Sequence, residues 1–261
     1  MEDERRRKEK VYRLALFVGE LVLRNGGETN RVERLGRLIC ESQGFRYASI
    51  YVTPTLLIVG DDREHGVTFM KSIKERGINL MRLALVNAFV MNLVKDKNID
   101  FDKALYLLKR LDKMESYGYW TKIFAVGCSA GAFVTLFDIS ILEWLITFII
   151  VTSAVVLTKY INAMSITPIL GTIISCFYIG MCSLTADYYG YTDSYHTIII
   201  GSILPFLPGI SITKSISDLV SGELISGSVR AVEAFLTALS IGIGIGGALH
   251  IWSSFGGVIN G

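Results

Sequence analysis

Charged side chains and helix-breaking residues interrupt an apolar part of this chain between residues 204 and 233, which read LPFLPGISITKSISDLVSGELISGSVRAVE. Ionised groups and non-helical backbone are costly in hydrocarbon, so they persist there mainly where they line a cavity, a polar pathway or a protein interface. The segment therefore predicts a pathway for a polar solute or an ion. Its candidate pathway residues are Pro208, Gly209, Thr213, Ser217, Asp218, Arg230 and Glu233.

Each of these charges has a functional and a structural interpretation. Asp218 could exchange protons or bind a substrate amino group, or it could pair with Lys214 one helical turn earlier. Arg230 and Glu233 share a helix face at i, i+3, which predicts a structural ion pair; alternatively, Arg230 could clamp a substrate carboxylate. The break at Pro208 and Gly209 shapes the backbone, and carbonyls freed there could also bind a polar solute.

The charge distribution indicates that this segment lies in a membrane domain. Of 26 Lys and Arg, 23 lie in residues 1–122, as do 17 of the 24 acidic residues. Two domains are therefore expected, at 1–118 and 119–261. Five apolar stretches in the second have about the 20 residues that a bilayer-crossing helix needs. They run at 120–137, 139–158, 163–185, 195–212 and 228–252.

The loops predict how these spans are oriented. The basic residues Lys122, Lys159, Lys214 and Arg230 fall on one side, whereas the links around Asp138 and at 187–193 carry no Lys or Arg. By the positive-inside rule, the N-terminal domain is cytosolic and the C-terminus is external. We thus expect a multi-pass protein of the inner (cell) membrane, in contact with the lipid bilayer.

The N-terminal domain shows two kinds of periodicity. Helical spacing at 11–23 ends at the Gly26-Gly27 pair, and a second helix begins near 28–30. Residues 46–59 and 67–73 are rich in β-branched and aromatic side chains and predict paired strands, with Pro54 in a turn, bulge or edge. Helical spacing returns at 79–94 and 101–114. The predicted fold is a polytopic α-helical membrane protein with about five spans and an N-terminal cytosolic α+β domain.

Two motifs at either end of the chain resemble one family. GGETNRVE at 26–33 and YVTPTLLIV at 51–59 are similar to the opening signature of the threonine/serine exporter family, and the LPG, Asp218, Arg230 and Glu233 series is similar to its fourth-to-fifth-span segment. Gly27 stands where the family commonly has Ala. The chain also lacks the second set of spans of full-length exporters, so it resembles the split form, in which a second short polytopic membrane subunit supplies that half. The cytosolic motif residues implied by the resemblance are Glu28, Thr29, Thr53 and Thr55.

The expected function is therefore a subunit of a secondary-active exporter of small carboxylate metabolites, with threonine and serine as the implied substrates and protons as the coupling ion. An odd number of spans also suits an inverted repeat with a second unit. Similarity within the split group extends to exporters of dicarboxylates such as succinate, which leaves the substrate open. A membrane-tethered hydrolase using the cytosolic motif residues is a rival, but no His or Cys accompanies them as nucleophile or base. A regulatory or assembly role of the domain fits the same residues. We expect no enzyme activity, metal, cofactor or nucleic-acid partner.

Overall fold

A computed structural model describes residues 2–61, 67–74, 77–95, 99–114, 117–137, 140–164, 167–192 and 194–255. Asp138 and Asp193, which belong to the predicted external links, lie outside these residues. The chain divides into two compact units. The first contains Met1–Ser116 together with Ile212–Ala231, and the second contains Tyr117–Ser211 and Val232–Gly261. The segment that carries Asp218 and Arg230 thus belongs to the same unit as the N-terminal domain.

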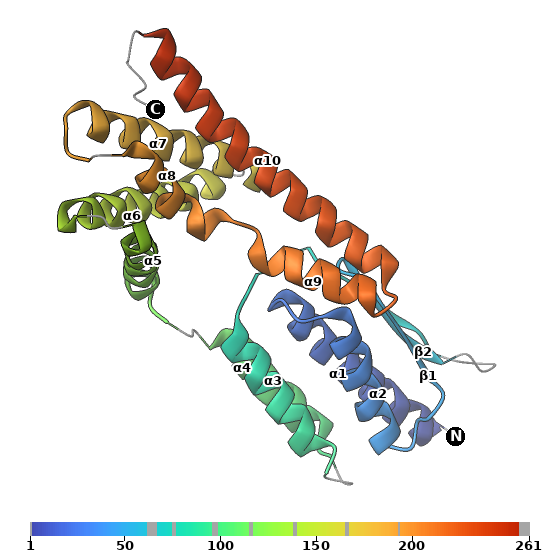
Figure 1. The fold of residues 1–261 in the computed structure, drawn as a ribbon. Helices are drawn as coiled ribbons and strands as arrows, with labels where there is room; N and C mark the ends of the chain where they lie inside the picture. Colours follow the sequence, from blue (N-terminus) through green and yellow to red (C-terminus); the bar gives the residue numbers. More distant parts are fainter. Residues whose placement is uncertain are drawn as a thin grey trace. The chain divides into compact units, whose positions relative to one another are not determined.

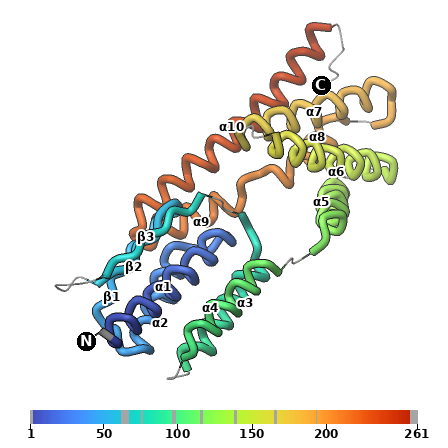
Figure 2. The backbone as a smooth tube through the Cα atoms, turned by 180° about the vertical axis from the view of Figure 1, so that it is seen from behind, coloured from blue at the N-terminus to red at the C-terminus, as the bar shows by residue number. Residues whose placement is uncertain are grey.

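The first unit combines helices with a small antiparallel sheet. Its elements are α1 (Glu2–Arg24), α2 (Thr29–Ser42), β1 (Ala48–Val52), β2 (Leu56–Asp61), β3 (Phe69–Ser72), α3 (Leu80–Leu93) and α4 (Phe101–Lys113). The strands pair in the order β1-β2-β3, and the Thr-Pro-Thr sequence forms the turn between the first two. Helices α1 and α2 pack on the sheet, while α3 and α4 pack against α1 (Figures 1 and 2). The predicted helices are confirmed, as is the pairing of 67–73 with the first β-rich run, which β3 makes with β2. The run 46–59 also folds back on itself, because β1 pairs with β2, and this pairing was not predicted.

The apolar face of α1 organises the core of this unit. Val11, Leu14, Val18 and Leu21 recur at helical spacing and are at most 1% exposed. They belong to one cluster that includes Leu57 of β2 and Val86 of α3. The first unit therefore has a hydrophobic core of its own, built from all of its layers.

The second unit is helical. It comprises α5 (Tyr119–Val134), η1 (Thr135–Phe137), α6 (Ile141–Ala163), α7 (Pro168–Tyr188), α8 (Tyr195–Ile203), η2 (Leu204–Phe206) and parts of α9 (Gly209–Val220) and α10 (Leu224–Ser254). Four stretches are long and apolar enough to cross a membrane: Tyr119–Phe137, Ile141–Ala163, Pro168–Tyr188 and Leu224–Ser254. A fifth candidate, Tyr195–Phe206 with Gly209–Val220, is bent by 52° at its break. By the length and composition of its helices, the chain thus has four or five candidate spans, in agreement with the expected number of about five.

Close helix packing explains the GxxxG pair of the first span. A Cβ at Gly127 would lie 2.6 Å from Thr152, and one at Gly131 would lie 2.6 Å from Trp144, both on α6. These glycines therefore let α5 and α6 approach each other closely within the chain.

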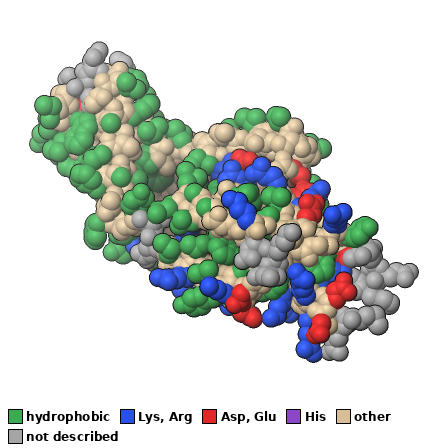
Figure 3. All heavy atoms as spheres, turned by 90° about the horizontal axis from the view of Figure 1, so that it is seen from below, with side chains coloured by type: hydrophobic (Ala, Val, Ile, Leu, Met, Phe, Trp, Pro, Cys, Tyr) green, Lys and Arg blue, Asp and Glu red, His purple; other side chains and the backbone are tan. Residues whose placement is uncertain are grey.

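The surface of the molecule differs from region to region. Charged side chains gather over one region, whereas another region shows hydrophobic and uncharged side chains (Figure 3). Many of the exposed side chains of the spans are large and apolar, including Phe124, Ile149 and Leu239, as expected for a surface in lipid.

Candidate functional site

The turn between α1 and α2 forms one side of the candidate site. Helix α1 ends with backbone bonds from Gly26 N to Leu23 O and from Gly27 N to Val22 O, and Gly26 has φ +84°. That left-handed conformation favours glycine. The N-cap of α2 is Glu28, whose side chain makes no cap hydrogen bond. Neither Thr29 nor Asn30 is at the N-cap position, because Thr29 is already the first residue of α2.

A tight connection between α9 and α10 forms the other side. Gly222 has φ +87°, and Glu223 N donates to Asp218 O. Ser215 Oγ then donates to Gly227 O at 2.7 Å. A Cβ at Gly227 would lie 2.5 Å from Leu219, so the small residue allows the two helices to meet closely. The connection brings Asp218 of α9 and Arg230 of α10 together.

Asp218 lies at the centre of a buried polar cluster that joins the two sides. Its side chain is 1% exposed, and its Oδ2 lies 2.9 Å from Arg230 Nε. Thr29 Oγ1 donates to Asp218 Oδ1 at 3.2 Å, and Arg230 Nη2 donates to Gly27 O at 3.2 Å. Lys214 Nζ donates to Gly26 O. We call Thr29, Lys214, Asp218, Arg230 and the carbonyls of Gly26 and Gly27 the Asp218 cluster.

The cluster holds more positive than negative charge. Two cations surround one buried carboxylate, and Glu28 nearby is only half-buried. Although Nε and Oδ2 form an ion pair, neither has an aligned hydrogen bond, and buried Ser226 Oγ has no hydrogen-bond partner in the described part of the chain. Ser226 precedes Arg230 by four residues and shares its helix face. Buried polar groups without an aligned hydrogen bond are uncommon, and strain, an ordered water or ion, or a functional role can each account for them.

The structure gives Asp218 a partner that spacing alone did not indicate. Arg230, and not Lys214 one turn earlier, is the ion-pair partner of Asp218. The i, i+3 spacing predicted Glu233 as the partner of Arg230; the guanidinium contacts Asp218 and the Gly27 carbonyl. The physical reason is the α9–α10 connection, which brings a buried carboxylate within reach of Arg230.

The other predicted pathway residues lie outside the Asp218 cluster. Pro208 is half-buried at the break between η2 and α9, and Gly209 is exposed at the start of α9. Thr213 is exposed, whereas Ser217 and Glu233 are half-buried. The cluster therefore contains Asp218 and Arg230 from the predicted pathway set.

The four motif residues of the N-terminal unit have different places in the structure. Thr29 contributes its hydroxyl to the cluster and Glu28 occupies the N-cap position of α2, whereas Thr53 Oγ1 accepts from Leu56 N at 3.0 Å and closes the β1–β2 turn. Thr55 O accepts from Ile73 N and so links the turn to β3. No group of three or more His, Cys, Asp or Glu that could hold a metal is found among the described residues. The Thr29 hydroxyl bonds a carboxylate that is itself ion-paired, which differs from a nucleophile activated by a free base.

Sequence reasoning missed two contributors to the cluster. Lys214 was considered only as a partner of Asp218, and the carbonyls of Gly26 and Gly27 were considered only as a helix stop. Ser226, which is not a member of the cluster, was not considered either. The i, i+4 spacing of Ser226 and Arg230, like that of Lys214 and Asp218, was a signal in the sequence that each pair shares a helix face. No local signal in the sequence indicates that the carbonyls of residues 26 and 27 accept hydrogen bonds from side chains 188 and 203 positions later.

Comparisons with known proteins agree with the motifs. Residues 13–252 match the sequence model of the family ThrE, described as "Putative threonine/serine exporter". The chain is also similar to a protein of Klebsiella aerogenes named "Probable succinate transporter subunit YjjP", with 21% identity over 256 residues. That alignment covers 97% of this chain and 98% of the relative. No solved structure matches the chain significantly.

Proposed function

Because the chain belongs to the ThrE threonine/serine exporter family, we propose that it is one subunit of a secondary-active exporter of small carboxylate metabolites, with threonine- and serine-type amino acids as its substrates. A succinate-type dicarboxylate is the second candidate, since the Klebsiella aerogenes relative is named for succinate transport. Both classes carry the same chemical group, a carboxylate.

The observation that carries this proposal is the buried Asp218–Arg230 pair. A substrate carboxylate has the same charge and geometry as the Asp218 side chain, so it can take the place of Asp218 beside Arg230. Protonation of Asp218 removes its negative charge and weakens its hold on the guanidinium. The Thr29 hydroxyl can turn and accept a hydrogen bond from the protonated carboxyl group, since a hydroxyl is both donor and acceptor. Proton binding and substrate binding would thus be linked at one residue pair.

We further propose that a second short polytopic membrane subunit completes the transporter. The word "subunit" in the relative's name supports a partner for that protein. Five spans would place the termini of this chain on opposite faces, with the N-terminus cytosolic and the C-terminus external by the distribution of basic residues. A partner inserted in the opposite orientation would give an inverted repeat. Reporters fused to each terminus test this orientation, and a cytosolic C-terminus would refute it.

Efflux from preloaded membrane vesicles tests the transport role. We expect this chain with its partner subunit to export threonine or succinate along an imposed pH gradient, and we expect Asp218→Asn to abolish the dependence on pH while membrane abundance stays near normal. Glu223→Gln is the matched control, because this half-buried carboxylate lies in the same α9–α10 connection but outside the cluster. Equal pH dependence in Asp218→Asn and the unaltered protein would eliminate the proton-carrier role. Full export without any partner would exclude the split-subunit arrangement.

A further inference from the structure

One end of the first unit exposes several large apolar side chains. Ile78, Leu80 and Met81 lie around the start of α3, and Met114 directly follows the end of α4. Their exposed fractions range from 44% to 64%. A single exposed apolar side chain is ordinary, but a group of them commonly marks contact with another protein or with a membrane. We call these four residues the apolar tip.

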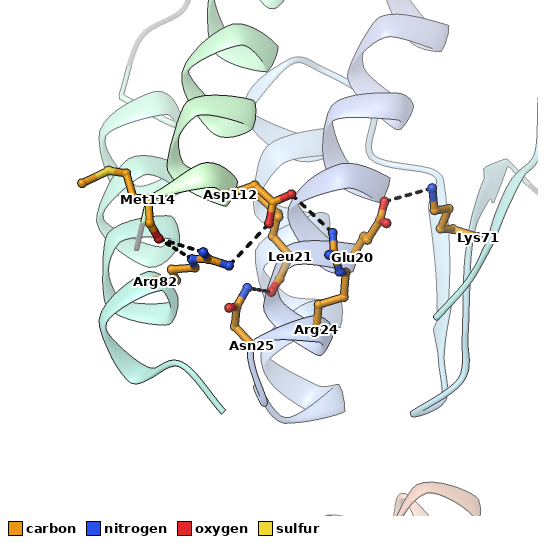
Figure 4. Close-up of polar contacts among 8 residues, drawn as sticks. All are labelled: Glu20, Leu21, Arg24, Asn25, Lys71, Arg82, Asp112 and Met114. Atoms are coloured by element: carbon orange, nitrogen blue, oxygen red, sulfur yellow. Dashed lines mark hydrogen bonds and ion pairs between the residues drawn. The ribbon is translucent and has the colours of Figure 1, made fainter. Parts of the chain in front are cut away.

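Hydrogen bonds hold the two parts of the apolar tip at the same end of the α3–α4 pair. Arg82, next to Met81, donates from Nε and Nη2 to Met114 O at 2.9 and 2.7 Å (Figure 4). Arg82 Nη1 also lies 3.8 Å from Asp112 Oδ1 in the last turn of α4. The start of α3 is therefore joined to the end of α4, and the exposed side chains of both helices belong to one end of the unit.

The covalent chain keeps this end near the first membrane span. Helix α4 ends at Lys113, and α5, a candidate span, begins at Tyr119. An extended chain advances at most about 3.6 Å per residue, so the distance from Lys113 to Tyr119 is at most about 22 Å. Met114 is the first residue of this link. The apolar tip is therefore within reach of the lipid surface at which α5 begins.

The last two turns of α4 place basic side chains beside the apolar tip. Lys109, Arg110 and Lys113 are exposed, and they share a helix face with exposed Tyr106. In the described part of the chain, none of these three basic side chains forms an ion pair. The acid among them, Asp112, is paired within the unit. Basic and aromatic side chains next to exposed apolar ones are typical of a surface that meets anionic lipid.

We propose that the apolar tip docks into the interfacial layer of the bilayer, with the basic end of α4 against anionic lipid headgroups. The charge near the link favours lipid as the occupant, because residues 109–122 include four basic and two acidic side chains. The proposal rests on the proposed placement of the N-terminal unit at the cytosolic face, where the leaflet carries anionic lipid. It does not depend on which metabolite is transported.

Docking at this point would also affect the Asp218 cluster. Gly77 N donates to Arg24 O and Asn79 N donates to Asn25 O, so the segment that carries Ile78 is tied to the end of α1. The carbonyls of residues 26 and 27, which belong to the cluster, follow directly in the chain. A docked tip would therefore hold the Asp218 cluster close to the membrane surface.

Photocrosslinking of the full-length protein in nanodiscs tests the docking. Benzoylphenylalanine, a photoreactive amino acid, replaces Leu80, and mass spectrometry identifies what it captures in discs of phosphatidylcholine and phosphatidylglycerol. We expect several-fold more lipid adduct from position 80 than from the same replacement at Tyr47. Tyr47 is nearly as exposed as Leu80 but lies at the opposite end of the unit, where Gln43 bonds to Arg7 of α1. The replacement at Phe124, exposed on α5, should capture lipid as a positive control.

A charge variant tests the contact with anionic lipid. A basic side chain near an anionic surface strengthens binding about fivefold, so phosphatidylglycerol should increase the lipid adduct at position 80 over that in pure phosphatidylcholine. The double variant Lys109→Gln/Lys113→Gln should lose most of this increase. Lys103→Gln is the matched control, because Lys103 is exposed on the same helix but lies at its other end, and it should keep the increase.

The outcomes separate the docking from its premises. Lipid adducts at position 124 but none at position 80, or equal adducts at positions 80 and 47, would overturn the docking while leaving α5 as a span. No lipid adduct at either 80 or 124 would overturn the docking together with the membrane span. An increase that persists in the double variant would refute the contact with anionic lipid. The terminal reporter fusions test the cytosolic placement separately.

Discussion

The Asp218–Arg230 pair makes a quantitative prediction about stability. Asp218→Asn keeps the size of the side chain and an oxygen that can accept from Thr29, but it removes the negative charge 2.9 Å from Arg230 Nε. Arg230 then lacks its counter-ion in a largely buried place, and Lys214 is a second cation that contacts the same α1–α2 turn. Arg230→Gln leaves the converse, a buried carboxylate without its ion-pair partner. Each single change therefore leaves one member of this ion pair without its partner, whereas the double change removes both members.

The expected magnitudes follow from burial. Removing one partner of a buried ion pair typically costs about 3–5 kcal/mol. Arg230 is 12% exposed and keeps the Gly27 carbonyl, so we place Asp218→Asn near the lower end, at about 3 kcal/mol. The double variant loses hydrogen bonds but leaves neither Arg230 nor Asp218 as an unpaired charge, and we expect it to cost about 1–2 kcal/mol. The coupling energy should thus exceed about 2 kcal/mol, because the two single costs add up to much more than the cost of the double variant.

Thermal unfolding of the detergent-solubilised protein measures this cycle. At about 2–4 °C per kcal/mol for a chain of this size class, Asp218→Asn should lower Tm by about 6–12 °C and the double variant by about 2–8 °C. Glu223→Gln serves as the control and should leave Tm nearly unchanged. If the costs of the two single variants simply add in the double variant, Asp218 and Arg230 are not energetically coupled. The proposal that a substrate carboxylate replaces Asp218 would then lose its basis.

Three further predictions concern the turn, the core and the break. Gly26→Ala places a side chain at φ +84° and close to Gly77 O and Lys214, so it should lower stability by about 1–3 kcal/mol and impair efflux; normal values for both would contradict the packing described here. Burial, with a smaller effect from the neighbouring Glu41, raises the pKa of Cys40 from 9.0 to about 12, so the folded protein should resist alkylation of this thiol at pH 8, as mapped by mass spectrometry. Because the raised pKa favours the protonated folded state, this contribution to stability is complete below about pH 9 and is lost as the pH rises from there towards 12. Pro208→Ala should restore helical hydrogen bonding across the break and reduce efflux, whereas Gly209→Ala should be tolerated, since a Cβ there meets nothing within 4 Å; equal effects would mean that the break is incidental.

Local sequence signals were sufficient for most of the secondary structure. The double glycine after 11–23 predicted where α1 ends, and Pro54 predicted a turn in the β-branched run, because both residues restrict or extend backbone conformation wherever they occur. Length and hydropathy likewise predicted the apolar spans. Such signals depend only on residues within a few positions of each other, so they can be interpreted without knowledge of the tertiary structure.

The identity of the polar partners needed the tertiary structure. The sequence placed Asp218 and Arg230 in one segment and Thr29 in another motif, but it could not predict that Thr29 and Asp218, 189 positions apart, would be in contact. It also favoured Glu233 as the partner of Arg230, because i, i+3 spacing is visible along one helix and a helix–helix connection is not. Arg24 and Asp112, 88 positions apart, likewise form an ion pair that no local signal indicates.

The sequence by itself thus determined the two kinds of element in this protein, an α+β unit and a set of apolar spans, because helical and strand periodicity and hydrophobic length are properties of short stretches of chain. Only the tertiary structure decided that residues 212–231 belong with the N-terminal unit and that their charges meet the α1–α2 turn. A buried charge binds whichever complementary group the packing brings within about 3 Å, and packing is a property of the whole unit.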